Sequence, residues 1–446
     1  MAIGIAAGAH GQQLTEELLE AFSFRAIGPS ATGGRIIDID VDPSHPATVY
    51  AAAASGGLWK TVNHGTTWDC VFEDQGTISI GDIAVDPSNP QTVWVGTGEA
   101  NNQRSSYFGD GIYKSTDGGE TWTNMGLEKT EHIGRIVVHP TDSNTVYVAA
   151  VGALYKHNPE RGVYKTTDGG DTWEKVEGGG LPETMLGKMN VAFAPSYPRV
   201  MYLMVEAAAP EGSAEDNLNG LYRSDDGGET WRRMNDFNTR PFYYSEVVVD
   251  PADPDRVYFS SLRFSEDGGE TTRDMARAVH VDFHAIWVDP NDPERIVLGN
   301  DGGIVVSFDR GGNYWFPNVI PLGQFYNVSY GMEVPYTVCG GLQDNYTWCG
   351  PSRKADEDIT NHDWFRVSGG DGFVTQQDPR YPELVYSESQ GGNMGRSNLE
   401  TGERTSFERP DWENVYREYQ DSIALLWPDV TEPMPEEHRS RIEGLQ

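Results

Sequence analysis

The sequence predicts an all-β protein, a β-propeller of about seven to eight four-stranded blades, and three observations support this fold class. The eight-residue motif at residues 115–122 (STDGGETW) recurs along the chain. A second motif at residues 41–46 (VDPSHP) recurs in phase with it. Their common period of about 40 to 60 residues is typical of stacked or radial repeats, and each period holds enough β-rich runs for four short antiparallel strands.

The first motif specifies a tight turn. Asp117 can accept hydrogen bonds from backbone N–H groups further along the chain, and the paired glycines supply the positive φ angle that a hairpin needs. Trp122 restarts an extended run with an indole large enough to anchor one sheet against the next. We assign a structural role to the aspartates at this position of the motif, which are Asp117, Asp168, Asp226, Asp267 and Asp309.

The second motif lies between two β-rich runs of each repeat. One unit therefore consists of a strand, a D-P-x-x-P turn, a strand, a variable loop, a strand, an aspartate turn and a last strand. The predicted blades begin near Gly34, Ile78, His132, Met185, Tyr243, His280, Gln324 and Ser368. We expect the propeller over residues 24–410, where it could belong to a larger or double propeller. Residues 1–23 would hold the remnant of a signal peptide and a short helix, and residues 411–446 a helical extension broken by prolines.

Composition narrows the function. The formal net charge of −35 argues against binding nucleic acid, which needs a basic face. No stretch approaches the roughly 18 consecutive apolar residues of a membrane span. Residues 1–11 (MAIGIAAGAHG) are similar to the end of a secretory signal, so we expect a secreted or periplasmic protein.

Two of the three cysteines are placed to form a bridge. Cys339 and Cys349 flank nine residues that contain glycines and an Asp-Asn pair, a span suited to a hairpin, and in an oxidising compartment they could form a disulfide. The alternative is two buried free thiols. The loop between them holds Gln343, Asp344 and Asn345, whose amide and carboxylate groups are suited to hydrogen-bonding a polar ligand.

The repeated S-x-D-x-G-x-T-W motif resembles that of the Asp-box (BNR) propellers, which include sialidases, two-propeller xyloglucanases and the sortilin/VPS10 receptors. Within this group the chain most resembles bacterial secreted proteins labelled sortilin-like or BNR-repeat glycosyl hydrolase, with which it shares residues 96–99 (GTGE) and 341–345 (GLQDN). The resemblance implies an exported propeller that binds a peptide or a glycan, as sortilin-like proteins bind peptides within the ring.

The repeat also predicts which face holds the site. The aspartate turn and the D-P-x-x-P turn of a blade lie on the same face, so the variable connections lie on the opposite one. The longest of them, residues 98–111, 152–162 and 206–220, are polar and contain aromatic residues, as binding loops often do. We therefore expect the site on this loop-rich face, around the pore.

Arginines and acidic residues near that face are candidate ligand contacts. Glu99 and Arg104 share the first long loop. Arg35 and Arg135 lie in matching Gly-Arg-Ile stretches, and two arginines pointing inward together would suit a carboxylate ligand, with structural salt bridges as the alternative.

Further candidates lie later in the chain. Asp301 and Asp371 lie in glycine-rich turns, where a carboxylate either contacts a ligand or caps the turn. His280, Asp282 and His284 alternate in the stretch HVDFHA, so on a strand they would share one surface. They could hold a divalent cation, or they could line a hydrated pore. We expect no other cofactor.

The alternative function is a glycoside hydrolase that uses two of Glu99, Asp282, Asp301 and Asp371. The sequence shows no complete catalytic set. The xyloglucanases carry a catalytic aspartate in a T-D-x-G-G-x-Y-R-W-like stretch, and the matching residues 54–60 (ASGGLWK) have Ser55 there, which cannot act as a carboxylate acid or base. Residues 24–29 (FRAIGP) only loosely match the first arginine motif of sialidases. A third alternative is a protein-interaction scaffold.

Overall fold

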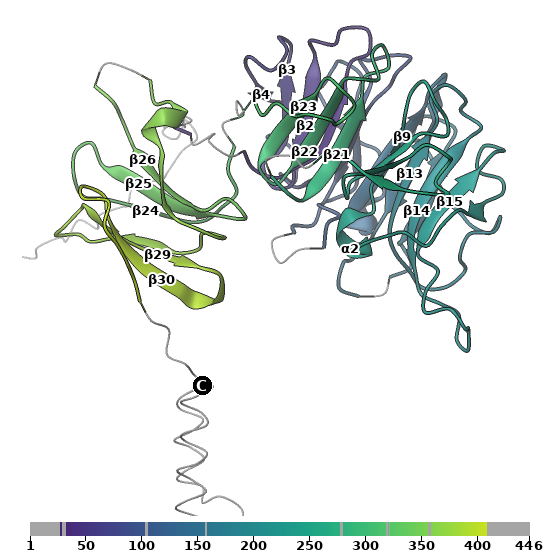
Figure 1. The fold of residues 1–446 in the computed structure, drawn as a ribbon. Coiled ribbons are helices and arrows are strands. Elements are labelled where there is room, and N and C mark those ends of the chain that lie inside the picture. The colour runs from purple at the N-terminus through teal and green to yellow at the C-terminus, as the bar shows by residue number, and fades with distance from the viewer. Residues whose placement is uncertain are drawn as a thin grey trace, which may run out of the picture.

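The computed structural model of the chain describes residues 27–28, 33–102, 106–156, 158–276, 280–317, 320, 322–355 and 358–407. Over these residues it contains eight antiparallel sheets, seven of four strands and one of three, and very little helix (Figure 1). The predicted all-β propeller and the number of blades are confirmed. The segments expected to be helical, within residues 1–23 and 411–446, lie outside the described residues.

Each sheet is a run of consecutive strands, in which neighbours in the sequence pair as neighbours in space. The first three sheets consist of β1 (Ile36–Val41), β2 (Val49–Ala53), β3 (Leu58–Thr61) and β4 (Asp69–Cys70); β5 (Ile80–Val85), β6 (Val93–Thr97), β7 (Ile112–Ser115) and β8 (Thr123–Asn124); and β9 (Ile133–His139), β10 (Asp142–Ala150), β11 (Gly162–Thr166) and β12 (Glu174–Val176).

The next three sheets consist of β13 (Leu186–Phe193), β14 (Met201–Ala207), β15 (Gly220–Ser224) and β16 (Arg232–Arg233); β17 (Val247–Val249), β18 (Val257–Phe259), β19 (Arg263–Ser265) and β20 (Arg273–Asp274); and β21 (Phe283–Val288), β22 (Ile296–Asn300) and β23 (Gly303–Ser307). The short helix α2 (Pro241–Tyr244) precedes β17, and a 3₁₀ turn (Glu128–Thr130) precedes β9. Each first strand begins within a few residues of the predicted blade start.

These six sheets surround a common centre. Their first strands line a central cavity of about 240 Å³. The sixth sheet packs against the first through Ala285 and Val297, which contact the cluster around Ile36, so the ring of six closes on itself. The D-P-x-x-P motif places one proline of each sheet around this cavity: Pro43, Pro87, Pro140, Pro195, Pro251 and Pro290.

Two of the motif tryptophans, Trp122 and Trp173, join neighbouring sheets as expected, whereas the indoles of Trp68 and Trp231 donate within their own turns. The indole N–H of Trp122, in the second sheet, donates to the carbonyl of Val71 in the first sheet at 2.8 Å, and its ring meets Phe72 edge to face at 5.1 Å. Trp173 repeats this one sheet further, on the carbonyl of Met125 at 3.0 Å. Such contacts join a hydrogen bond to aromatic packing.

The aspartate turns form the predicted hydrogen bonds. Asp117 accepts from the Ser115 hydroxyl at 2.7 Å, from the Thr121 backbone N–H at 2.9 Å and from the Thr121 hydroxyl at 2.5 Å. The N–H of Gly118 donates to the carbonyl of Gln91, which lies in the D-P-x-x-P turn of the same sheet. The two turns of a sheet are therefore neighbours on one face, which leaves the long connections on the other.

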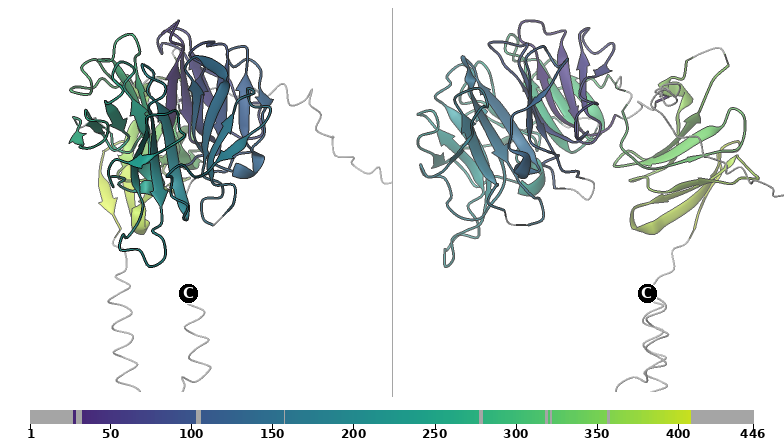
Figure 2. Two further views of the ribbon diagram at one scale, coloured as in Figure 1. Left: turned by 90° about the vertical axis from the view of Figure 1, so that its right-hand side faces the viewer. Right: turned by 180° about the vertical axis from the view of Figure 1, so that it is seen from behind.

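Two further sheets lie beside the ring (Figure 2). They consist of β24 (Phe325–Tyr330), β25 (Thr337–Leu342), β26 (Thr347–Pro351) and β27 (Phe365–Ser368); and β28 (Thr375–Gln377), β29 (Leu384–Ser389), β30 (Asn393–Asn398) and β31 (Arg404–Ser406), with 3₁₀ turns at Asn361–Asp363 and Gln390–Gly392. Among the described residues, no helix is long and apolar enough to span a bilayer.

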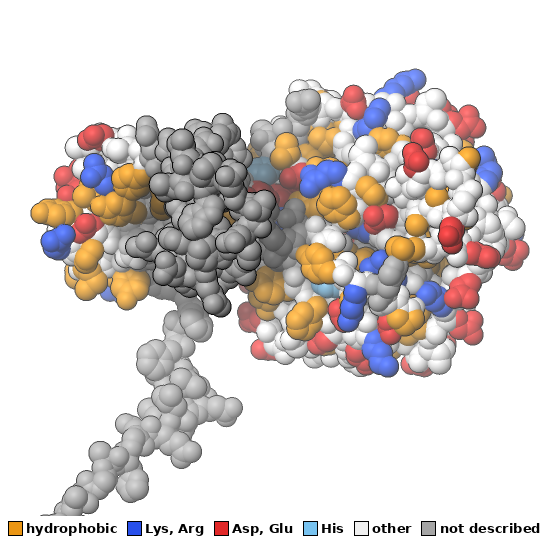
Figure 3. Space-filling model, turned by 90° about the horizontal axis from the view of Figure 1, so that it is seen from below, with side chains coloured by type: hydrophobic (Ala, Val, Ile, Leu, Met, Phe, Trp, Pro, Cys, Tyr) orange, Lys and Arg blue, Asp and Glu red, His pale blue; other side chains and the backbone are white. Residues whose placement is uncertain are grey.

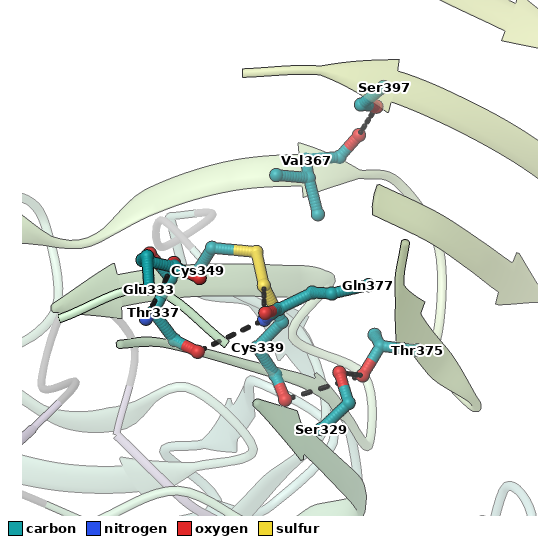
Figure 4. The surroundings of a disulfide bond; sticks show 9 residues. All are labelled: Ser329, Glu333, Thr337, Cys339, Cys349, Val367, Thr375, Gln377 and Ser397. Atoms are coloured by element: carbon teal, nitrogen blue, oxygen red, sulfur yellow. Dashed lines mark hydrogen bonds between the residues drawn. A yellow bond between two sulfur atoms is a disulfide. The ribbon is translucent and has the colours of Figure 1, made fainter. Parts of the chain in front are cut away.

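A disulfide joins the middle strands of the seventh sheet. Cys339 on β25 and Cys349 on β26 pair directly across the hairpin and are bonded to each other (Figure 4). Gln377 of β28 donates its side-chain amide to Cys339 Sγ at 3.0 Å, so the bridge also contacts the eighth sheet. Cys70 is the free cysteine of the described chain.

Candidate functional site

Arg35, just before β1, is the centre of a buried cluster on the loop-rich face. Its guanidinium donates to both carboxylate oxygens of Asp301 at 2.8 and 3.1 Å, to Glu99 Oε1 at 2.6 Å and to Gln343 Oε1 at 2.7 Å. The side chain is 1% exposed. Burial lowers the pKa of Arg35, but the charges of Glu99 and Asp301 outweigh it and hold the pKa well above the ordinary value.

Asp301, at the end of β22, connects Arg35 to a histidine. Nε2 of His284 lies 2.9 Å from Asp301 Oδ1, and the Tyr243 hydroxyl donates to Asp301 Oδ2 at 3.3 Å. Burial would raise the pKa of Asp301, but Arg35 and then His284 hold that pKa below its ordinary value. The Asp301 side chain is 1% exposed, so the ion pair is sealed from solvent.

The tautomer of His284 follows from the next contacts. Lys188 Nζ donates to Asn101 Oδ1 at 2.6 Å, and because an ammonium can only donate, this contact fixes the orientation of the Asn101 amide. The Asn101 amide nitrogen, 3.2 Å from His284 Nδ1, then donates to that nitrogen. His284 therefore carries a proton on Nε2, directed at Asp301. Lys188 also donates to Glu246 Oε1 at 2.8 Å and to the Tyr243 carbonyl at 3.0 Å.

The tip of the disulfide-bridged hairpin enters the same cluster. Asn345 donates its side-chain amide to the carbonyl of Asp301 at 2.6 Å, and Gln343 accepts from Arg35. Asp344 Oδ2 lies 3.5 Å from the Arg35 guanidinium, and its backbone N–H donates to Asp371. Burial, together with Asp301 and Asp371, raises the pKa of Asp344 to about 9, so this carboxyl is protonated at neutral pH.

Three carboxylates come close together at the outer side of this cluster. One oxygen each of Asp282, Asp301 and Asp344 lie within 4.8 Å of one another. Asp282 accepts from the Tyr244 hydroxyl, and Arg240 Nη1 lies 3.7 Å from its carboxylate. Asp282 and Asp344 are 21% and 26% exposed at the side chain. They are therefore the acidic groups of the cluster that a ligand can reach.

The predicted metal triad is not assembled. The strand β21 begins only at Phe283, and Asp282 before it has a φ of 60°, so the expected alternation does not extend back to His280. His284 points into the buried cluster, whereas His280 lies against Gly302. In the described part of the chain, the acidic group around Asp282 is the one compact enough for a cation.

Arg135 lies apart from Arg35. Strand pairing sets Arg135 opposite Ala149, just as Asp38 is set opposite Ala52 after a similar bulge, so Arg135 matches Asp38 rather than Arg35. The prediction that the two arginines occupy equivalent positions is therefore wrong, because Arg135 matches a position three residues after Arg35. Arg135 bonds Asp38 at 3.3 Å and Asp82 at 3.2 Å at the central cavity, which agrees with the salt-bridge alternative.

Most of the other candidate site residues are buried. Glu99, Asp301 and Asp371 are each at most 3% exposed, and so a substrate cannot contact them without a rearrangement. Arg104 lies outside the described residues. Arg35, Glu99, His284, Asp301 and the tip of the hairpin come together, but they do so in a buried network.

Beside this network the loop-rich face carries hydrophobic side chains among charged and polar ones (Figure 3). A hollow of about 350 Å³ is lined by Asn102, Arg161, Glu206 and Phe242 among others, and a neighbouring one of about 300 Å³ by Phe108 and Tyr155. Leu154 lines both, so the two are adjacent. They lie over the second, third and fourth sheets, where the long polar loops were predicted.

Three comparisons show which known proteins the chain resembles. A family model described as sortilin, neurotensin receptor 3, matches residues 110–263. A xyloglucanase from a Paenibacillus species is 28% identical over 232 residues, which are 47% of this chain and 22% of that protein. A xyloglucanase of Acetivibrio thermocellus is 30% identical over 141 residues, 28% of this chain and 15% of that protein.

Solved structures show the same architecture. A GH74 enzyme from Niastella koreensis aligns with a TM-score of 0.58 at 16% identity, over 87% of this chain and 68% of that one. A GH74 xyloglucanase from Xanthomonas campestris aligns with a TM-score of 0.50 at 14% identity, over 85% and 74%. The chain is an Asp-box propeller that resembles sortilin/VPS10-like proteins and glycosyl hydrolases. At these identities the solved structures establish the fold alone, and the curated matches span about a fifth or less of their relatives' length.

Sequence reasoning missed the part of this Asp-box propeller's network that carries no motif. Lys188, Asn101, Tyr243 and Glu246 come from three different sheets or connections, and no local pattern marks them. A lysine inside the apolar run of β13 is the one signal that could have indicated a buried ion pair, because a buried ammonium requires partners.

Proposed function

We propose that the protein binds a carbohydrate chain across the loop-rich face of the six-sheet ring. One observation carries the proposal: Phe108, Tyr155 and Phe242, with exposed fractions of 71%, 72% and 41%, border the two adjacent hollows. Aromatic side chains that cluster at a hollow on an otherwise polar face mark a ligand-binding groove. Their flat apolar faces suit the faces of sugar rings.

The walls of the larger hollow supply polar groups. Arg161 donates to the carbonyls of Val151, Ala153 and Leu186 at 2.6 to 2.9 Å, and these three bonds hold its guanidinium in place. Glu206 and Asn219 line the same hollow. Donors and acceptors held in fixed positions beside an aromatic surface are suited to hydroxyl groups, each of which both donates and accepts.

The similarity to proteins named xyloglucanase makes xyloglucan the first ligand to test. A secreted or periplasmic location is part of the proposal, because polysaccharides of this kind lie outside the cell and the Cys339–Cys349 bridge forms in an oxidising compartment. A peptide ligand is the main competitor, and the binding test below includes it.

The test is calorimetric titration of the protein with xyloglucan oligosaccharides and, separately, with a mixed peptide library. We expect saturable binding of the oligosaccharides, weakened about tenfold by Tyr155→Ala or by Phe108→Ala, a loss of about 1.4 kcal/mol. Tyr197→Ala is the matched control, since Tyr197 is 55% exposed but lies in a D-P-x-x-P-type turn on the opposite face. Peptide binding without oligosaccharide binding, or equal effects of all three substitutions, would overturn the proposal.

A second candidate function is glycoside hydrolysis, favoured by the pair Asp282 and Asp344. Their nearest oxygens lie within 4.8 Å, which is nearer to the roughly 5–5.5 Å of retaining enzymes than to the roughly 6.5–9.5 Å of inverting ones. Asp344, with its pKa raised to about 9, has the protonation state of a general acid at pH 7. Against hydrolysis stands Ser55, which occupies the position of the catalytic aspartate of the xyloglucanases and has no carboxylate.

Release of reducing sugar from xyloglucan tests this second function. If the protein is a hydrolase, we expect release of reducing sugar. Asp344→Asn and Asp282→Asn should each reduce this turnover at least a hundredfold, which is the usual contribution of one general acid. If the unsubstituted protein bound the oligosaccharides tightly without turnover, the hydrolase hypothesis would be contradicted and carbohydrate binding would remain as the proposed function.

A further inference from the structure

A separate cavity of about 490 Å³ lies between the third and fourth sheets of the ring. It lies under residues 177–185, the connection from β12 to β13, and is lined by residues of β11, β12, β13 and β14. Leu186 lines both this cavity and the larger hollow of the loop-rich face, so the chain at the start of β13 forms the wall between them. The cavity is therefore distinct from the proposed carbohydrate groove.

The floor of this cavity is apolar. Met189 on β13 and Leu203 and Val205 on β14 are each at most 3% exposed, and Val163 on β11 is 6% exposed. These four side chains belong to the core cluster between the two sheets, and all four line the cavity. An apolar group that entered it would leave water for a hydrophobic wall, which favours binding.

The roof is held open by contacts with the fourth sheet. Residues Gly178, Gly179 and Gly180 have φ angles of 77°, 67° and 92°, a conformation that side-chain-bearing residues rarely adopt. The N–H of Trp231 donates to the carbonyl of Gly179 at 2.8 Å. A Cβ atom on Gly180 would lie 2.6 Å from the Trp231 carbonyl, so the close approach needs glycine there. The aspartate turn of the fourth sheet thus fixes the roof, and the cavity is preformed.

The rim of the cavity is acidic. Glu177 and Glu183 are exposed and line it, and neither makes an ion pair with another described residue. Among the described residues of the lining, Lys175 is the one cationic side chain, and it donates its ammonium to the carbonyl of Pro159 at 2.9 Å. The rim therefore has two carboxylates against one ammonium that is already hydrogen-bonded, within a chain whose net charge is −35.

We propose that this cavity is a binding site for a small amphiphilic cation. The apolar chain of the ligand lies on Met189, Leu203 and Val205, and its ammonium or guanidinium group lies at the rim beside Glu177 and Glu183. The two requirements are independent, because shape and apolar floor select the chain whereas the unpaired carboxylates select the charge. An anionic amphiphile of the same length meets the same floor but the wrong charge at the rim.

Calorimetric titration with n-hexylammonium, n-hexanoate and n-hexanol tests the site. We expect n-hexylammonium to bind at least about tenfold tighter than n-hexanoate, with n-hexanol between them. The double substitution Glu177→Gln/Glu183→Gln should reduce this preference to about threefold or less, and because both side chains are exposed the variant should fold. Glu174→Gln, an exposed glutamate of β12 that does not line the cavity, should leave the preference unchanged.

A second variant tests the cavity itself. Leu181→Trp places an indole where the half-buried Leu181 lines the cavity, and it should abolish binding of all three probes while leaving xyloglucan titration as in the unsubstituted protein. Equal affinity for the cation and the anion, a preference that survives the double substitution, or absence of n-hexylammonium binding at millimolar concentration would each overturn the assignment. None of these results bears on the carbohydrate proposal, whose groove lies on the other side of Leu186.

Discussion

Asp344 shows how a single residue depends on its surroundings. Its carboxyl is partly buried, lies beside Asp301 and Asp371 and keeps its proton at neutral pH, because burial and the two neighbouring acids raise its pKa to about 9. In the unfolded chain the same group ionises near pH 4. The folded state therefore binds one more proton than the unfolded state between these two values, and the contribution of Asp344 to stability falls as pH rises through that range.

The substitution Asp344→Asn removes this dependence. We expect the melting temperature of the variant, relative to the unsubstituted protein, to increase steadily from pH 5 to pH 9 and then to level off, because asparagine has no proton to lose. Differential scanning calorimetry at five pH values measures the difference. A difference that stays constant with pH, or that shrinks as pH rises, would contradict the protonated state of Asp344. Asp274→Asn, an acid with an 83% exposed side chain, is the control and should give no trend.

Replacing Arg35 should strongly reduce the stability of the fold. Its buried guanidinium pairs with Glu99 and Asp301, so Arg35→Met leaves uncompensated carboxylates in the interior and should destabilise the protein by about 3–5 kcal/mol. Adding Asp301→Asn to the variant should recover part of this loss, since one of the stranded charges is then removed. Urea denaturation measures both.

Arg232→Met is the matched control, because Arg232 is 56% exposed and its ion pair with Asp225 should contribute less than about 1 kcal/mol. If Arg35→Met were no more destabilising than Arg232→Met, the cluster would not be a structural centre of the ring.

At the scale of elements, the sequence predicted best what is encoded locally. The aspartate turns, the D-P-x-x-P turns, the strand starts and the anchoring tryptophans each depend on a few consecutive residues, and the structure has them where they were expected. The register of the strands was harder to predict from the sequence. Arg35 lies before β1 whereas Arg135 lies within β9, so Arg135 takes the position of Asp38, and nothing in the matching Gly-Arg-Ile stretches signals this difference of register.

The aspartate turns make a specific prediction. Asp168→Ala removes the acceptor of the Thr166 hydroxyl and of both donors of Thr172, and should lower the melting temperature by a few degrees. Asp171→Ala, in the same turn but without these bonds, should have little effect. The turn hydrogen bonds lower the pKa of Asp168 to about 2, so the penalty should shrink as pH falls from about 4 to about 2. Equal melting temperatures for the two variants would show that the aspartate is dispensable.

A further prediction concerns the hairpin that carries the Cys339–Cys349 disulfide. Thiol counting under denaturing, non-reducing conditions should find one free thiol, that of Cys70, in protein recovered from an oxidising compartment. In Cys339→Ser/Cys349→Ser, hydrogen exchange should accelerate in residues 337–351 and remain unchanged in β9 to β16, because a single hairpin opens locally without opening the ring. Three free thiols, or acceleration throughout the ring, would contradict this assignment.

At the scale of the whole molecule, the sequence predicted eight sheets but not how they divide. Six of them close a ring through the contact of β21 with β1, and two lie beside it, joined to the ring at Arg35 by the tip of the bridged hairpin. That division depends on contacts between residues about 250 to 310 positions apart, which no repeat period reveals. The loop-rich face, in contrast, followed directly from the alternation of turns within each blade.

The central claim is that the loop-rich face binds the ligand, and hydrogen exchange with and without saturating xyloglucan oligosaccharide tests it most directly. The structure predicts slower exchange in residues 98–111, 152–162 and 206–220, and unchanged exchange in the turns at residues 86–91, 115–122 and 166–173 on the opposite face. Protection confined to those turns, or protection on neither face, would contradict the account.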